Sequence, residues 1–239
     1  MAIHFNADVS NEGLVLLLDA GNTRSYPGTG TTWTDISGSG GTNFTINASA
    51  YNSSGPKYMD FGGSYGCAVT SSGVDTTFSG TVTAILWTRI LNSSSNWRTL
   101  FRAESSGNDH QVIVQSGGWA IGMYDNVNGT GFNSSGFSQQ SIPGYGTSQW
   151  NMLVWRWVST QNDFYYYSFT YNDTPETLRG YVSSSNARFK SGFRTLGAYY
   201  AASPSQFWGD IAYLAMYNRR IDDNEVRTMF QAQRGRYGI

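Results

Sequence analysis

The carboxylate and imidazole side chains that could catalyse a reaction are sparse in this chain. Its 239 residues include only four glutamates, at Glu12, Glu104, Glu176 and Glu225. Retaining glycosidases need two carboxylates about 5 Å apart, and a Glu-x-Asp-x-Glu pattern supplies them because alternate residues of a strand face the same side. No glutamate lies two residues from an aspartate on an expected strand. We therefore expect no glycosidase centre of this kind.

The two histidines offer no better general base. His110 follows Asp109 within the turn-like sequence SSGNDHQ, and neighbouring residues of a strand would point to opposite faces. No serine-centred nucleophile motif accompanies this pair, and His4 lies in an N-terminal segment without a recognisable partner. We expect His110 to be a solvated turn residue and the protein to have no enzymatic activity.

A metal ion has one candidate loop. The sequence YDNVNGTG presents side-chain oxygens at Asp125, Asn126 and Asn128, and calcium prefers oxygen ligands of this kind. The same residues suit a tight turn, because Asn128-Gly129 tolerates positive φ angles. Both interpretations stay open, one calcium ion or a turn alone, and no other cofactor is expected.

Aromatic side chains make up 15% of the chain, and exposed ones could stack on the apolar faces of sugars. The best candidates are in YYAASPSQFW, at Tyr199, Tyr200, Phe207 and Trp208, and GYGTSQW (144–150) comes second. The alternative is that these rings pack the edge of the protein's own core.

The overall composition excludes several kinds of partner. The formal net charge is -1 and no run of Lys or Arg occurs, so we expect no nucleic-acid binding, which needs clustered positive charge. No apolar run approaches the ~20 residues that span a bilayer, and the N-terminal residues lack the pattern of a signal peptide. Cys67 is the only cysteine, so no internal disulfide can form.

Short apolar runs separated by Gly, Ser and Asn clusters recur along the whole chain. This punctuation predicts about a dozen strands in one all-β domain, a two-sheet antiparallel jelly-roll β-sandwich. RTLFRAE and QVIVQS are expected to form a hairpin, as are the two halves of WAIGMYDNVNGTGFN. The expected strands also include 13–20, 58–63, 65–69, 80–90, 149–160, 163–171, 176–182, 193–200 and 209–218.

The chain ends with a change from strand to helix periodicity. GDIAYLAMYN is apolar at both alternating sets of positions, so both faces of this strand should be covered. A short helix should then run from about Asp223 to Arg234, with Asp222 as N-cap, Glu225 completing a capping box and Gly235 ending it. The residues expected in or near the core are Trp87, Trp155, Ile211, Leu214 and Tyr217.

This closing pattern resembles that of laminin-G-like domains in the concanavalin A-like lectin/glucanase superfamily. WTDISGSGGTNFTI is similar to the opening of such domains, and TVTAILWTRI and QWNMLVWRWVST are similar to their central Trp strands. MDFGGSYGCAV departs from the family's Phe-Asp-Gly order. The resemblance covers roughly Gly13 to Arg234 and implies a two-sheet jelly roll, often with one calcium ion at its rim.

The two ends are similar to stand-alone domains of this type in the virions of tailed phages. GLVLLLDAGNTRSYPG and RGRYGI carry this second resemblance. It implies a structural protein of the virion, in head decoration, neck or tail, that contacts other virion proteins or further copies of itself. The alternative function is a lectin-like module that attaches to glycans.

The expected organisation is an N-terminal arm (1–12), the sandwich (13–234) and a C-terminal tail (235–239). Both ends should dock on a neighbouring subunit, since neither can bury enough of itself to offset about 1–2 kcal/mol of ordering per backbone residue. The alternative is that they fold back along their own domain. The expected assembly contacts are Ile3, Phe5, Arg234, Arg236, Tyr237 and Ile239.

Overall fold

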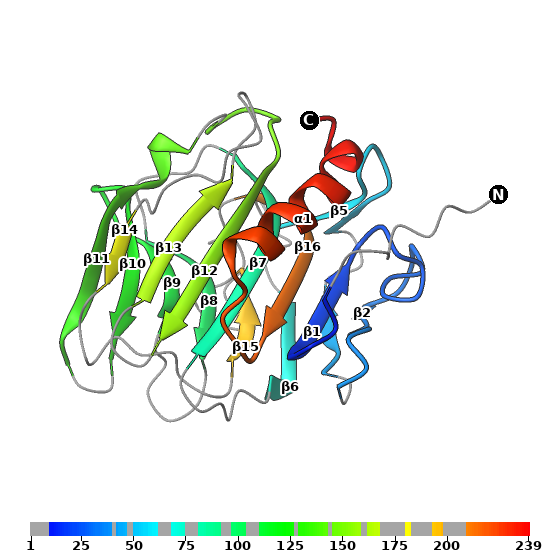
Figure 1. The fold of residues 1–239 in the computed structure, drawn as a ribbon, viewed down its shortest axis with the longest axis horizontal. Helices are drawn as coiled ribbons and strands as arrows, with labels where there is room; N and C mark the ends of the chain where they lie inside the picture. Colours follow the sequence, from blue (N-terminus) through cyan, green and yellow to red (C-terminus); the bar gives the residue numbers. More distant parts are fainter. Residues whose placement is uncertain are drawn as a thin grey trace.

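A computed structural model gives the architecture of the chain (Figure 1). The structure describes residues 10–39, 42–46, 50–61, 68–74, 81–91, 97–103, 110–126, 129–142, 145–158, 162–167, 180–182, 193–197 and 209–239. Among these residues, no helix is long and apolar enough to cross a bilayer.

Two antiparallel sheets of eight strands each pack face to face, which confirms the predicted sandwich. Sheet A contains β14 (Gly180–Val182), β13 (Asn162–Tyr167), β12 (Asn151–Val158), β7 (Thr81–Ile90), β16 (Gly209–Tyr217), β5 (Tyr58–Asp60) and β4 (Tyr51–Asn52) in that order, with β1 (Leu14–Asp19) also pairing β16. Sheet B contains, in order, β11 (Gly131–Ser138), β10 (Ala120–Asp125), β9 (His110–Val114), β8 (Arg98–Ala103), β15 (Phe193–Leu196), β6 (Ala68–Val74), β3 (Phe44–Ile46) and β2 (Thr32–Trp33). Both predicted hairpins are present, β8 with β9 and β10 with β11.

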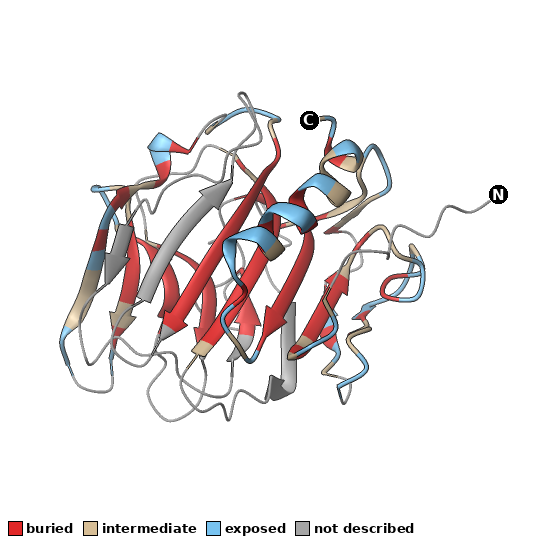
Figure 2. Ribbon diagram, viewed as in Figure 1, coloured by how far each residue is buried: buried red, intermediate tan, exposed pale blue. Residues whose placement is uncertain are grey.

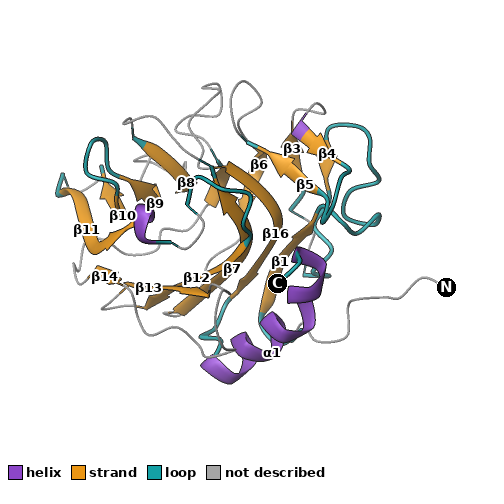
Figure 3. Ribbon diagram, turned by 90° about the horizontal axis from the view of Figure 1, so that it is seen from above, coloured by secondary structure: helices purple, strands orange, loops and turns teal. Residues whose placement is uncertain are grey.

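The main core lies between the two sheets (Figure 3). Trp155 and Trp157 of β12 point into it and meet Phe101 of β8 edge-on, with ring centroids 5.4 and 6.1 Å apart. The five residues that the sequence placed in or near the core are all buried.

A second apolar layer covers the outer face of sheet A (Figure 2). Every residue of β16 is buried, because β16 lies between the interior and helix α1 (Asp223–Gln233), as its two apolar faces predicted. Val226, Met229 and Phe230 of α1 pack against Trp87 and Tyr217 in this layer.

Both ends of α1 were predicted to within one residue, but the way in which it ends was not. The Asp222 carboxylate accepts a hydrogen bond from the Glu225 N–H at 2.8 Å. The Glu225 carboxylate accepts one from the Asp222 N–H at 3.1 Å, which completes the capping box. Gly235 does not end the helix. The chain continues into a 3-10 turn, η4 (Arg234–Tyr237), which ends at Gly238 in a left-handed conformation with φ of 75°.

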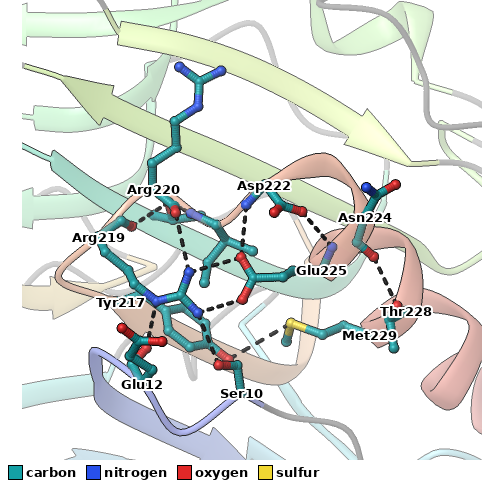
Figure 4. Close-up of polar contacts among 12 residues, drawn as sticks. Ser10, Glu12, Tyr217, Arg219, Arg220, Asp222, Asn224, Glu225, Thr228 and Met229 are labelled. Carbon is teal, nitrogen blue, oxygen red and sulfur yellow. Dashed lines mark hydrogen bonds and ion pairs between the residues drawn. The ribbon is translucent and has the colours of Figure 1, made fainter.

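The N-terminal end of the described chain is held by Arg219, which follows β16 (Figure 4). Its guanidinium donates to the Ser10 hydroxyl at 2.9 Å, to the Glu12 carbonyl at 2.8 Å and to the Glu225 carboxylate. One side chain therefore joins the segment before β1 to the cap of α1. The proposed anchors Ile3 and Phe5 lie outside the described residues.

The C-terminal residues fold back on their own domain, which corrects the expectation that 235–239 stands away from the sandwich. Tyr237 is 6% exposed and stacks on Trp87 with centroids 3.9 Å apart. Arg236 forms an ion pair with Asp19 at 2.7 Å and donates to the Pro56 carbonyl. These residues pack against the apolar layer that contains Trp87. The sequence alone did not show that this layer would lie next to them. Arg234 donates to the Ile239 carbonyl at 2.9 Å.

Candidate functional site

The preferred aromatic candidates, Tyr199, Tyr200, Phe207 and Trp208, lie outside the described residues. The structure does describe both flanks of that segment. The Gly197 N–H donates to the Leu100 carbonyl at 2.8 Å, near the start of β8. Gly209 pairs with Ile90 at the end of β7. Both flanks therefore reach the same end of the sandwich.

The second aromatic candidate, 144–150, comes to this end as well. The Gly146 N–H donates to the Ile90 carbonyl at 2.9 Å, so Tyr145 lies next to the last residue of β7. The Tyr145 ring is half-buried against the main core and lies 6.3 Å from the Trp119 ring, at an angle of 71°. Tyr145 and the two described flanks, Gly197 and Gly209, thus lie at the same end of the sandwich, although they are far apart in the sequence.

Trp119 is a candidate site residue that the sequence analysis did not identify. It precedes β10 in the β9–β10 turn, has a φ of 58°, and its side chain is only half-buried. A left-handed backbone costs a non-glycine residue roughly 1–2 kcal/mol. The surrounding turn holds it there, because the Trp119 N–H donates to Gln115 and its carbonyl accepts from Gln139 N–H at 3.0 Å. Strain of this kind concentrates at functional sites, and the bulky aromatic directly after Gly117-Gly118 was its sequence signal.

Arg98, the first residue of β8, supplies the charge at this end. Burial lowers the pKa of Arg98, and the Tyr145 phenol partly offsets that effect, which indicates that the two side chains are neighbours. An arginine presents five N–H donors in a fixed plane. We call Arg98, Trp119 and Tyr145 the sandwich-end cluster. It combines two half-buried rings with a guanidinium that is only 8% exposed, and the rings can contact the apolar face of a ligand.

The predicted metal loop connects β10 and β11, whose last pair joins Asp125 and Gly131. Asp125 is 2% exposed and accepts a hydrogen bond from the Thr130 hydroxyl at 2.9 Å. Asn126 is exposed, Gly129 has a φ of 71°, and Asn128 lies outside the described residues. In the part of the chain that the structure describes, no three His, Cys, Asp or Glu side chains group as a metal site would require. Asp125 acts as a brace for the turn, and the calcium ion stays a prediction.

The prediction that His110 is a solvated turn residue is wrong. His110 begins β9, pairs with Arg102 and Tyr124, and is 2% exposed. Its Nδ1 shares a hydrogen bond of 2.8 Å with the Thr99 hydroxyl. Burial, together with the positive charge of Arg102, lowers the pKa of His110 to about 3. The strand starts one residue earlier than expected because cross-strand partners, which the local sequence does not reveal, enclose the ring.

A third group of rings lies on the face of sheet B that points away from the core. Tyr124 alternates along β10 with Ile121 and Met123, which belong to the core, so it faces outward. The Trp97 ring meets the Tyr124 and Phe132 rings at 5.5 and 5.4 Å, and all three side chains are half-buried. These rings pack edge to face, so each of them is already in contact with a neighbouring ring.

Comparison with known proteins identifies the fold. No protein-family model matches the chain, and no curated protein matches it significantly. Trypanosoma rangeli sialidase in complex with sialic acid matches over 94% of this chain, with a TM-score of 0.62 and 16% identity. The receptor-binding domain of botulinum neurotoxin D matches over 93%, with a TM-score of 0.61 and 12% identity. The chain has a concanavalin A-like β-sandwich fold.

At these identities the likeness shows the concanavalin A-like fold alone. The chain spans 33% of the length of the sialidase and 53% of the neurotoxin domain. Sialic acid is the ligand of the sialidase structure and a receptor is the partner of the neurotoxin domain. A shared fold does not transfer either role, because function depends on the site that a fold carries.

Proposed function

We propose that this concanavalin A-like domain is a lectin-like module that binds carbohydrate at the sandwich-end cluster and has no catalytic activity. The observation that carries the proposal is Trp119, a half-buried ring held in a left-handed backbone conformation beside Tyr145. The left-handed backbone costs free energy, and the ring stays partly open to solvent. Such a ring is better placed to contact a ligand than to pack the core.

The chemistry of the cluster suits a sugar. A pyranose ring has an apolar C–H face, which stacks on indole or phenol, and a rim of hydroxyls, which form hydrogen bonds. Trp119 and Tyr145 meet at 71°, so one ring can take the face of a sugar and the other its edge. Gly197 and Gly209, which flank four further aromatic residues in the sequence, both lie at this end of the sandwich.

The alternative role, assembly into a phage particle, has less support. Two of the residues expected to dock on a neighbour are engaged within the domain, Tyr237 in the layer on sheet A and Arg236 with Asp19. The structural neighbours are proteins with a sugar ligand or a receptor-binding role. Residence in a virion stays a prediction, and mass spectrometry of purified particles tests it.

Binding is tested by screening the purified domain on a glycan array and then by calorimetry with a panel of methyl pyranosides. We expect at least one sugar to bind, and Trp119→Ala or Tyr145→Ala to weaken it about tenfold or more, which corresponds to about 1.4 kcal/mol. Trp97→Ala is the matched control, because it removes a half-buried indole from the outer face of sheet B and should leave affinity unchanged. No binding on the array, with or without calcium, would refute the proposal.

A further inference from the structure

The connections between strands at the sandwich end have uncharged sequences. Four connections have described flanks or contacts there: 91–97 after β7, 115–119 between β9 and β10, 139–150 before β12, and 197–208 before β16. Their sequences include no Asp, Glu, Lys, Arg or His, although charged residues make up 13% of the chain. None of these connections therefore supplies an ionic partner for a ligand.

The two rings of the sandwich-end cluster are bordered by neutral polar side chains. The Tyr145 hydroxyl is buried and makes no hydrogen bond, so the open part of this side chain is its ring. The 3-10 turn η3 (Gln139–Ser141) lies next to Trp119, because its first N–H donates to the Trp119 carbonyl at 3.0 Å. Gln140 and Ser141 of η3 are exposed. An amide and a hydroxyl can each donate and accept hydrogen bonds, which suits the hydroxyls of a sugar.

The cations nearest to the cluster are already held by the protein. Arg98 is 8% exposed and has interactions within the domain. Arg89 forms an ion pair with Asp210 at 2.5 Å. Its guanidinium also lies over the Tyr58 and Trp150 rings, 4.5 and 5.3 Å from their centroids. Neither arginine presents an open positive charge to a ligand that contacts the cluster.

This distribution of charge defines the class of sugar that fits. A carboxylate or sulfate loses part of its hydration when its sugar packs against aromatic rings, and that loss is costly unless a cation or several donors replace the water. We propose that the sandwich-end cluster selects neutral pyranosides over sugars that carry a carboxylate or a sulfate, an inference that rests on the proposed function. The rings contact the C–H face of the sugar, and neutral side chains such as Gln140 and Ser141 contact its hydroxyls.

Matched pairs of sugars test the selection directly. Each methyl pyranoside is compared by calorimetry with the uronide in which a carboxylate replaces the hydroxymethyl group, for example methyl glucoside with methyl glucuronide. A pyranoside that binds should do so about threefold or more tightly than its uronide, because the carboxylate gains no ionic partner. Its affinity should change by less than about twofold between low and high salt, since salt screens only contacts between charges.

A cation added beside Trp119 should weaken the selection. Gln140→Lys places an ammonium group on η3, and the affinity for the uronides should rise about two- to fivefold, as expected for an exposed ion pair. High salt should remove this gain. Gln231→Lys is the matched control, because it makes the same change at an exposed glutamine of α1, on the outer face of sheet A. It should give no gain.

The outcomes separate the two proposals. If neither member of any pair binds, the proposed function and the selection both fall. If a uronide binds as tightly as its neutral parent or more tightly, the selection is refuted and the proposed function stands. If the neutral sugar is preferred but Gln140→Lys and Gln231→Lys have the same affinity for the uronide, the preference does not arise from the charge beside Trp119, and the inference is again refuted.

Discussion

The rings on the outer face of sheet A and those at the sandwich end are buried to different extents. On sheet A, Trp87 is fully buried between Phe230 of α1 and the C-terminal Tyr237, with centroids 5.7 and 3.9 Å away. At the sandwich end, Trp119 and Tyr145 are half-buried. The one α-helix among the described residues lies on sheet A (Figure 3). Whether a ring is fully packed or left partly open therefore depends on the element that covers it, and not on the sequence around the ring.

The two sheets also differ in how their buried acids and bases respond to pH. Asp210 on sheet A has a raised pKa, so acid stabilises its site, whereas His110 on sheet B has a lowered pKa, so acid destabilises it. Burial is the largest cause in both, because it disfavours the charged form of either group. One physical cause therefore gives the two sheets opposite pH dependences.

The largest expected effect is on the outer face of sheet A, which α1 and the C-terminal residues cover. Trp87→Ala should lower the free energy of unfolding by about 3–5 kcal/mol, the usual cost of deleting a buried aromatic ring. It also removes a hydrogen bond from Trp87 Nε1 to Gln233 at 2.5 Å. Urea denaturation followed by circular dichroism measures the loss. Trp97→Ala is the control and should cost much less; equal losses would erase the distinction between covered and half-open rings.

Acid should act on sheet B through His110. Its folded pKa of about 3 lies below the unfolded value of 6.5, so the unfolded state binds the proton first. Stability should therefore be complete above pH 6.5 and fall by a few kcal/mol as the pH drops toward 3. His110→Asn removes the titration and should flatten the difference between pH 7 and 4. Parallel curves for the two proteins would show that His110 is not buried in its neutral form.

Tyr237 tests whether the C-terminus belongs to the domain. Tyr237→Ala should cost about 2–4 kcal/mol, since it opens a cavity between Trp87 and Trp150, whose rings lie 3.9 and 5.4 Å away. Tyr237→Phe is the matched control, because the Tyr237 hydroxyl is buried without a hydrogen-bond partner, and its loss should be neutral or slightly stabilising. If Tyr237→Ala unfolds at the wild-type urea concentration, the C-terminal residues are free to dock elsewhere.

Local patterns allowed much of this fold to be predicted. The capping box at Asp222 and Glu225 involves residues three apart, and the apolar pattern of β16 shows its double coverage without any partner being known. The β10–β11 hairpin follows from one turn sequence. Such features need only the nearest residues along the chain.

The site could be predicted only in part, because it depends on contacts between distant segments. The sequence singled out 144–150 and 199–208, but not that Gly146 and Gly209, the residue after the second segment, both contact Ile90. The Arg89–Asp210 ion pair near this end depends on the register of β7 and β16, and its two residues lie 121 positions apart in the sequence. Tyr237 was expected to dock on a neighbour because the direction of α1, and therefore the place of Tyr237, is set by packing on sheet A.

The smallest expected effect is the most specific, and it concerns the backbone under Trp119. Because φ is 58° there, glycine fits without strain whereas alanine does not. Trp119→Gly should therefore be about 1 kcal/mol more stable than Trp119→Ala, although both lose the ring and both should lose sugar binding. Trp97 does not have a positive φ. There the alanine variant should be the more stable one, because glycine relieves no strain and only raises the conformational entropy of the unfolded state. Urea unfolding of the four variants measures both differences. If alanine is the more stable replacement at both positions, the backbone at Trp119 stores no strain, and the main argument that its ring is held for a ligand is lost.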